Sequence, residues 1–351
     1  MKTLSRRSFL ARGAALAAAS AFPPFFVRAS DKSGTRAPVV GSGQFTYECV
    51  HDWVLPPEGL LWGDTHGLCQ DAEGLIYVAH TVHPTSRRGE SIVAYDAEGR
   101  FVRAFGERFR NGAHGLVLHA DAGTESLVHC DINRSKVVRT SLTGDVLWEH
   151  GYPSEDPAYG AAPIKFVPTN VAFTPSGEFF VGDGYGSSRM LRFSAKGAFL
   201  GEVGRPGHGD GEFDTPHGQW VDARGADPVL VVADRGNRRI QLFGLDGAHR
   251  KTVKDEAHLR MPCYFSIRGD LMVCPDLDSQ VCLLDRDYKV VAQLGDGQAE
   301  NGKVGSRRNQ TRGQFTPGKF ITPHAAIFLH SGDILVAEWL PIGRITLLRR
   351  V

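Results

Sequence analysis

The feature that most constrains this chain is an internal repeat of about fifty residues. Six short motifs recur, and the second residues of successive motifs lie 48, 55, 48, 46 and 61 positions apart. Each motif opens a short apolar run, followed by a turn, a second run, an Asp-containing loop and further runs, which is typical of a meander of β-strands. One such sheet cannot bury both of its faces, whereas six packed around an axis can. The motifs are Thr65-His66-Gly67, Ala113-His114-Gly115, Pro168-Thr169-Asn170, Pro216-His217-Gly218, Pro262-Cys263-Tyr264 and Pro323-His324-Ala325.

We therefore predict an all-β fold for residues 31–351, a six-bladed β-propeller of four-stranded antiparallel blades. The last repeat ends after three apolar runs, and residues 45–53 form an unmatched run before the first repeat. This segment is expected to add the missing outer strand of the last blade. Such a closure removes an exposed sheet edge.

The first thirty residues differ from the rest. The segment Ser5-Arg6-Arg7-Ser8-Phe9-Leu10 precedes an alanine-rich stretch, and Val27-Arg28-Ala29 offers a small-residue cleavage site. This pattern resembles a twin-arginine export signal, and the apolar stretch is too short for a spanning helix. We expect residues 1–30 to direct export to the periplasm or the exterior, with no membrane attachment afterwards. The alternative is a basic disordered N-terminus.

Charge and cysteine content narrow the classes of partner. A formal net charge of +1 gives no support for binding nucleic acid or an anionic membrane. Six cysteines are too few for a disulfide scaffold in a chain of 351 residues, and no Cys-x-x-Cys occurs. A small-molecule or peptide-derived substrate is compatible with these features and is the partner that we expect.

The second position of the motif should form a ring around the axis, because the innermost strand of each blade runs beside the central channel. Histidines occupy this position in the second, fourth and sixth blades, about 120° apart in a six-bladed ring. Three neutral imidazoles can bind one ion and leave a coordination position open. The ring reads His66, His114, Thr169, His217, Cys263 and His324.

We predict that His114, His217 and His324 bind Zn²⁺ or another divalent transition metal. His66 and Cys263 are candidates for extra ligands or for partners of the ligands. His80 is a further candidate, since it follows an inner apolar run that should end near the channel mouth. The alternative is that histidine is merely tolerated at the half-buried start of a strand.

Two resemblances sharpen this prediction. The stretches Gly211-Glu212-Phe213-Asp214-Thr215-Pro216 and Ala233 to Phe243 resemble the NHL family of propellers, which specifies a fold without a function. More narrowly, four motifs are similar in order and spacing to the catalytic propeller of peptidyl-α-hydroxyglycine amidating lyase. They are Pro168-Thr169-Asn170-Val171, Asp183-Gly184-Tyr185-Gly186-Ser187-Ser188-Arg189, Pro216-His217 and Ala233-Asp234-Arg235.

The lyase resemblance implies zinc on His114, His217 and His324, a catalytic tyrosine at Tyr185 and a substrate-binding arginine at Arg235. This sequence also departs from the family. Ala325 replaces the carboxylate of the family's calcium site, and the carbonyl of Leu116 alone is a poor site, so Ca²⁺ is doubtful. The family's first-blade arginine has no clear counterpart; Arg87 and Arg88 are the nearest candidates.

The resemblance implies an exported, metal-dependent lyase that cleaves a C–N bond in an α-hydroxyglycine-like hydroxy acid and releases a glyoxylate-type product. The alternative is a non-catalytic NHL propeller that binds a protein or glycan. A calcium-dependent sugar-lactone hydrolase is less favoured, because the ring is poor in acids. The basic loop from Gly295 to Lys319 is either a lid that attracts acidic substrates or a solvated connection between blades.

Overall fold

The computed structural model describes residues 37–156, 159, 165–302 and 304–351. The predicted export signal, residues 1–30, lies outside the described residues. Among the described residues, no helix is long and apolar enough to cross a membrane.

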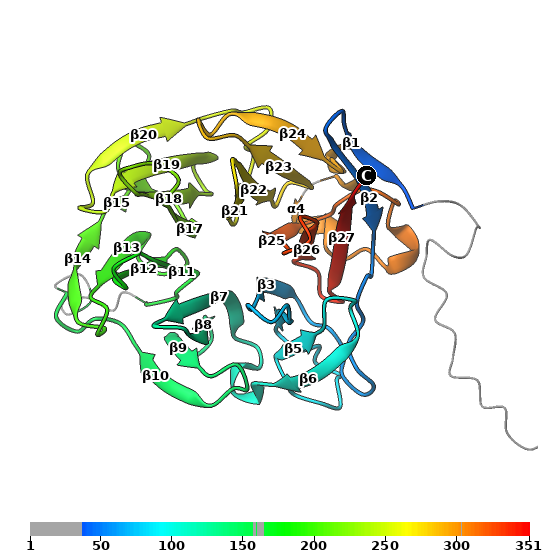
Figure 1. Cartoon of the computed structure of the whole chain (residues 1–351), viewed down its shortest axis with the longest axis horizontal. Coiled ribbons are helices and arrows are strands. Elements are labelled where there is room, and N and C mark those ends of the chain that lie inside the picture. The colour runs from blue at the N-terminus through cyan, green and yellow to red at the C-terminus, as the bar shows by residue number, and fades with distance from the viewer. Residues whose placement is uncertain (1–36, 157–158, 160–164, 303) are drawn as a thin grey trace, which may run out of the picture. The chain divides into compact units, whose positions relative to one another are not determined.

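Six antiparallel sheets surround an axis, which confirms the predicted β-propeller (Figure 1). The strands of a blade pair in chain order, with the first beside the axis and the last at the rim. Blades 1 to 3 consist of β3 (Thr65–Gln70), β4 (Ile76–His80), β5 (Ile92–Tyr95) and β6 (Phe101–Phe105); β7 (Ala113–Asp121), β8 (Thr124–Asp131), β9 (Lys136–Thr140) and β10 (Val146–His150); and β11 (Asn170–Phe173), β12 (Phe179–Asp183), β13 (Arg189–Phe193) and β14 (Phe199–Val203). Blades 4 and 5 consist of β17 (Pro216–Asp222), β18 (Val229–Asp234), β19 (Arg239–Gly244) and β20 (His249–Val253); and β21 (Ser266–Arg268), β22 (Leu271–Asp276), β23 (Gln280–Leu284) and β24 (Val290–Leu294).

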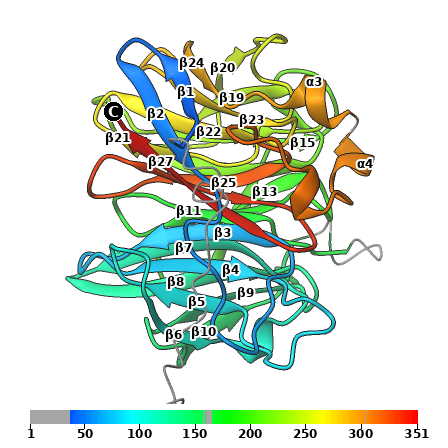
Figure 2. The ribbon, with the colours of Figure 1, turned by 90° about the vertical axis from the view of Figure 1, so that its right-hand side faces the viewer.

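The sixth blade contains both ends of the folded chain. Its strands are β25 (Pro323–Phe328), β26 (Ile334–Glu338), β27 (Arg344–Arg350), β2 (Phe45–Val50) and β1 (Val39–Ser42), in that order. The pairing of β2 with β27 confirms the predicted closure, and Figure 2 shows these strands side by side. The extra rim strand β1 was not expected. The predicted run to Trp53 is also too long, because β2 ends at Val50 and Asp52 adopts a positive φ of 51°.

The core consists of six apolar clusters, each between two neighbouring blades. Leu68 of blade 1 packs with Ala325 of blade 6, and Val128 of blade 2 packs with Val181 of blade 3. Each blade is therefore apolar on both faces. Ring closure is what removes the last two faces from water, and apolar burial is the main favourable term in folding.

The connection between β24 and β25 is more ordered than the sequence suggested. It contains the short helices α3 (Gln298–Asn301), α4 (Val304–Arg307) and η2 (Arg312–Gln314), which Figure 2 places at one side of the ring. Three of its described basic residues pair with acids outside the connection: Arg307 with Asp278 at 2.9 Å, Arg308 with Asp64 at 2.5 Å, and Arg312 with Asp52. Lys319 pairs with Glu300 of the same connection at 3.3 Å. The segment is thus bound to the propeller rather than simply solvated. A short helix η1 (Glu107–Phe109) and the parallel pair β15 (Arg205–Pro206) and β16 (Glu212–Phe213) lie between other blades.

Closure by β2 gives a stability prediction. Tyr47 of β2 is 2 % exposed and packs in the cluster between blades 5 and 6. Replacing it (Tyr47→Ala) should lower the free energy of unfolding by about 3–5 kcal/mol and the unfolding temperature by roughly 5–10 °C. The reason is that a cavity opens where β2 closes the ring, a place that we call the seam. Glu48→Ala, in the same strand but in a partly exposed ion pair with Arg349, is the control and should change little. Equal thermal unfolding of the two variants would contradict the role assigned to the seam.

Candidate functional site

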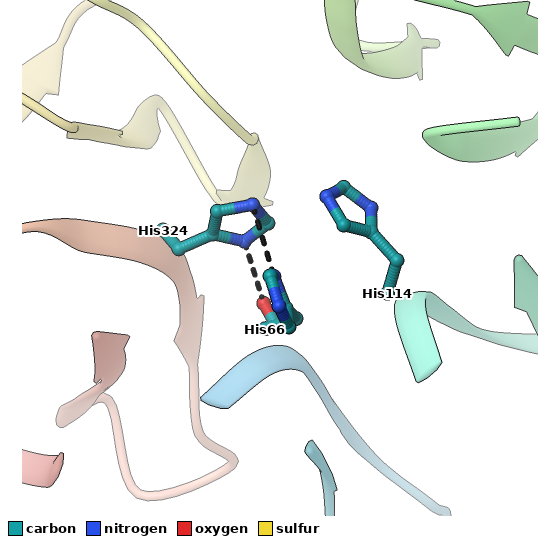
Figure 3. A group of neighbouring side chains, drawn as sticks. All are labelled: His66, His114 and His324. Carbon is teal, nitrogen blue, oxygen red and sulfur yellow. Dashed lines mark hydrogen bonds between the residues drawn. The ribbon is translucent and has the colours of Figure 1, made fainter. Parts of the chain in front are cut away.

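Four histidines of the predicted ring meet at the axis. His66, His114, His217 and His324 are each the second residue of an inner strand, and each is 4 % exposed or less. The ligand nitrogens of His66, His114 and His324 all lie within 4.8 Å of one another, and Figure 3 shows these side chains turned toward one another. The ring of His217 lies beside them, with its centroid 4.6 Å from that of His324 and 5.0 Å from that of His114. We call these four residues the histidine cluster.

An irregularity in strand pairing accompanies every member of the cluster. In each of these four inner strands, the register with the second strand shifts at the histidine. A β-bulge of this kind bends a strand and redirects a side chain, which is how the imidazole turns toward the axis. The shifts fall between Thr65 and Gly67, Ala113 and Leu116, Pro216 and Gln219, and Pro323 and Ala325.

Hydrogen bonds between blades set the tautomers of three of these rings. In each case Nδ1 lies against the backbone carbonyl of the ring position in the next blade. A carbonyl can only accept, so Nδ1 carries the proton and Nε2 keeps its lone pair for another partner. The bonds are His114 to Thr169 O (2.8 Å), His217 to Cys263 O (2.9 Å) and His324 to His66 O (3.0 Å).

A glycine follows the histidine in two of these three cases and explains how those two bonds can form; after His324 the residue is Ala325. A Cβ at Gly115 would lie 2.5 Å from the carbonyl oxygen of Thr169, and a Cβ at Gly218 would lie 2.2 Å from that of Cys263. Both distances are far below van der Waals contact. Glycine therefore allows the next strand to approach closely enough for its carbonyl to accept the imidazole proton.

The cluster is built from neutral imidazoles. Burial lowers the pKa of His114 to about 3, opposed by its bond to Thr169. Burial also lowers the pKa of His66, His217 and His324 well below the ordinary value, and positive charges nearby act in the same direction. Neutral imidazole is the form that binds a metal ion.

One nitrogen–nitrogen distance within the cluster matches that expected around a tetrahedral ion. Nδ1 of His66 lies 3.3 Å from Nε2 of His324. Two nitrogens bound at zinc distances and separated by the tetrahedral angle lie about 3.3–3.4 Å apart. The buried group His66, His114 and His324 could therefore hold a metal ion. His66, which the sequence suggested only as an extra ligand, lies in this closest group, and the predicted ligand His217 lies next to it.

Tyr185 and Arg235 both reach the cluster from neighbouring loops. Tyr185, between β12 and β13, places its hydroxyl oxygen 3.0 Å from Nε2 of His217 and 3.3 Å from Nε2 of His114. Arg235, between β18 and β19, lies over the tyrosine ring at 5.3 Å from its centroid. Burial raises the pKa of the Tyr185 phenol, and the Arg235 guanidinium acts against that rise. No carboxylate pairs with Arg235 within the described ranges, so a positive charge without an acidic partner faces the site.

Two other predicted residues take different places. The thiol of Cys263 donates to the carbonyl of Met261 at 3.5 Å, and burial raises its pKa to about 11. It contributes through its carbonyl, which anchors His217. His80 accepts from the amides of Gly63 and Val82 at 3.3 and 3.1 Å and lies against Trp62, so it is not brought into the cluster.

The position suggested for calcium contains groups of another kind. The carbonyl of Leu116 accepts a hydrogen bond from the hydroxyl of Tyr264 at 3.2 Å. Ala325 is fully buried and packs with Tyr264 in an apolar cluster. A hard cation needs several oxygen ligands, and this donor set does not fit Ca²⁺.

Sequence reasoning missed Tyr264 and Arg308. Tyr264 holds the third motif position, where four of the six motifs have glycine or alanine. A large residue in a position otherwise filled by small ones is a signal that could have marked it. Arg308 was noticed only as one basic residue of a loop, and its place beside the cluster depends on how the longest repeat folds back, for which the sequence offers no local signal.

Comparisons with known proteins identify relatives of this chain. No family model matches the chain. A probable peptidyl-alpha-hydroxyglycine alpha-amidating lyase of Caenorhabditis elegans is 23 % identical over 270 residues, which cover 74 % of this chain and 70 % of the relative. NHL repeat-containing protein 3 of Mus musculus is 28 % identical over 183 residues, 49 % of each chain, so the match spans about half the length of that relative. Peptidyl-glycine alpha-amidating monooxygenase B of Xenopus laevis is 41 % identical over 91 residues, which are 24 % of this chain and 10 % of the relative.

Among solved structures, a streptogramin B lyase aligns with a TM-score of 0.58 at 13 % identity, covering 88 % of this chain and all (100 %) of the other. An inactive virginiamycin B lyase from Staphylococcus aureus aligns with a TM-score of 0.57 at 12 % identity, over 87 % of this chain and 100 % of the other. Identities this low support the fold alone. The chain is an NHL-type six-bladed β-propeller, related at modest identity to peptidyl-alpha-hydroxyglycine alpha-amidating lyases and to NHL repeat proteins.

Proposed function

We propose that the chain is an exported, metal-dependent lyase that cleaves the C–N bond of an α-hydroxyglycine-like acid and releases a glyoxylate-type product. The observation that supports this most strongly is the meeting of three features at one place. Buried neutral histidines present their lone pairs, a tyrosine hydroxyl contacts two of them, and Arg235 lies over that tyrosine with no acidic partner among the described residues.

The metal would be held by His66, His114 and His324, with His217 adjacent. When bound, such an ion supplies Lewis-acid polarisation of a substrate oxygen. Nitrogen donors suit zinc and other divalent transition metals better than calcium or magnesium. The carbonyl bonds to Nδ1 orient the imidazoles, so little rearrangement is needed for binding.

Tyr185 is assigned to proton transfer. Cleavage of R–CO–NH–CH(OH)–COO⁻ into an amide and glyoxylate removes one proton from the hydroxyl oxygen and adds one to the nitrogen. A single tyrosine beside both atoms could accept the first proton as a phenolate and then, as the phenol so formed, deliver it to the leaving nitrogen. Because Tyr185 Oη lies 3.0–3.3 Å from two imidazole nitrogens, it faces the position of the reacting hydroxyl group.

Arg235 is assigned to the carboxylate of the substrate. A guanidinium forms paired, charge-assisted hydrogen bonds to a carboxylate, and it does so best where water is partly excluded. Its place over the Tyr185 ring would hold the carboxylate on one side of the phenol. Substrates without an acidic group should therefore bind poorly.

A metal analysis tests the ion site. Protein purified from a metal-sufficient host should contain about one divalent transition metal per chain. His114→Ala and His324→Ala should both lose it, while His119→Ala should keep it, because His119 is further along β7 and stacks on Phe173. Comparing His66→Ala with His217→Ala identifies the third ligand. Full metal content in both His114→Ala and His324→Ala would argue against the site.

A kinetic assay tests the reaction. Metal-replete protein should release glyoxylate from α-hydroxyhippurate. Tyr185→Phe should lower kcat by roughly 10²–10⁴, because the group that carries the proton is lost. Arg235→Gln should raise KM, and His119→Ala should behave like the unmodified protein. If the unmodified protein produces no more glyoxylate than Tyr185→Phe, this substrate class is wrong.

Export is tested separately. Replacing the two arginines of the N-terminal motif (Arg6→Lys with Arg7→Lys) should leave the protein in the cytoplasm, since the twin-arginine pair is the feature on which that prediction depends. Cell fractionation measures the outcome, with Arg28→Lys as the control. Unchanged export of the double variant would contradict twin-arginine transport.

A further inference from the structure

Arg308 contacts residues of two neighbouring blades, the first and the sixth. Its Nη2 pairs with Asp64 at 2.5 Å, and its Nε donates to the carbonyl of Trp339 at 3.1 Å. The guanidinium carbon lies 3.4 Å from the centroid of the Trp339 ring, so the planar group stacks on the indole. A group with these three contacts has a defined position.

Both anchors of Arg308 lead directly to the histidine cluster. Asp64 is two residues before His66. Trp339 exchanges hydrogen bonds with Thr322, which is two residues before His324: its amide donates to the Thr322 carbonyl at 2.8 Å, and its carbonyl accepts from the Thr322 hydroxyl at 2.6 Å. The connection between β24 and β25, which we call the insertion, therefore places Arg308 beside the strands that carry His66 and His324, two of the three histidines in the close group.

The charge of Arg308 acts on the site. It is among the groups that add to burial in lowering the pKa of His66, and with Arg235 it opposes the burial that raises the pKa of Tyr185.

Arg308 also keeps hydrogen-bonding capacity. Nε and Nη2 are engaged, whereas Nη1 has no hydrogen-bond partner among the residues that the structure covers. The side chain is 20 % exposed, which leaves it accessible to a ligand. Arg235 comes from blade 4, which faces blade 1 across a six-bladed ring, so the two guanidinium groups approach the axis from different sides.

We propose that Arg308 is a second anion-recognising residue of the site, and that it selects ligands with a carboxylate together with Arg235. This inference rests on the proposed function for the identity of the ligand, but its test does not require turnover. It gives the insertion between β24 and β25 a specific role: the segment carries a guanidinium toward the axis, whereas Arg307 and Arg312 fasten it to residues outside the segment.

The test compares two probes that differ in one charge. Hippurate carries the carboxylate and lacks the reactive hydroxyl, and hippuramide is its neutral amide. The metal-replete, full-length protein should bind hippurate more tightly than hippuramide in a calorimetric titration. Arg308→Ala should weaken hippurate binding about tenfold and leave hippuramide unchanged, because one charge-assisted contact is lost. Arg308→Lys should recover part of the difference.

Two further variants separate recognition from simple anchoring. Arg312→Ala removes a guanidinium of the same insertion that contacts Asp52 and two carbonyls, and it should leave the preference for hippurate intact. Asp64→Asn frees Arg308 from its only acidic partner in the described chain and should tighten hippurate binding. If Arg308 were only an anchor, Asp64→Asn would loosen the segment and bring no gain in affinity. Thermal unfolding of each variant verifies that the fold is retained.

The outcomes are distinct. An equal loss for both probes in Arg308→Ala, no loss for either, or no preference in the unmodified protein would overturn the inference. If hippurate preference depends on Arg308 while no glyoxylate is formed from α-hydroxyhippurate, the proposed function fails and the inference stands. If glyoxylate is formed and Arg308→Ala leaves KM unchanged, the proposed function stands and the inference about Arg308 fails.

Discussion

Every blade of this protein is a sheet with two apolar faces, and the chain buries all of them by closing a ring. The six clusters between neighbouring blades are the core, and the pairing of β2 with β27 joins the sixth blade to the start of the chain. Because packed interiors deform little, this closure also sets the separation of the inner strands at the axis. The positions of the four histidines therefore follow from the packing between blades, whereas Tyr185 and Arg235 come from loops.

The closure of the ring also orients the side chains of the histidine cluster. His114, His217 and His324 each donate to a carbonyl of the adjacent blade, so the orientation of a ring depends on the neighbour and not on its own strand alone. Glycine at positions 115 and 218 makes the close approach possible. The bulges turn the side chains inward, and burial keeps them uncharged. These features together leave oriented lone pairs that could bind a metal ion with little rearrangement.

The fold and the histidine cluster could largely be predicted from the spacing of the motifs. Residues at the same position of each repeat lie at the same height along the axis of a propeller. The six blades, the closing strand and the meeting of His66, His114, His217 and His324 follow from that spacing. The repeat spacing does not give the tilt of an imidazole or the shape of a β-bulge. It therefore could not predict that His66, rather than a strict set from alternate blades, groups with His114 and His324. His80 was misjudged because the end of a strand does not reveal which way a side chain is held. Arg308 depends on a long-range pairing with Asp64, 244 positions away, which no local pattern encodes.

The hydrogen bonds from imidazoles to carbonyls of the next blade constrain how the number of blades in such a propeller can change in evolution. They run from the second blade to the third, from the fourth to the fifth and from the sixth to the first, so the axis repeats with a unit of two blades inside an architecture that repeats with one. Insertion or loss of a single blade would interrupt this alternation of donor and acceptor positions around the axis. A gain or loss of an adjacent pair would preserve the alternation. Lineages that retain this centre should therefore vary their blade number by duplication or deletion of pairs.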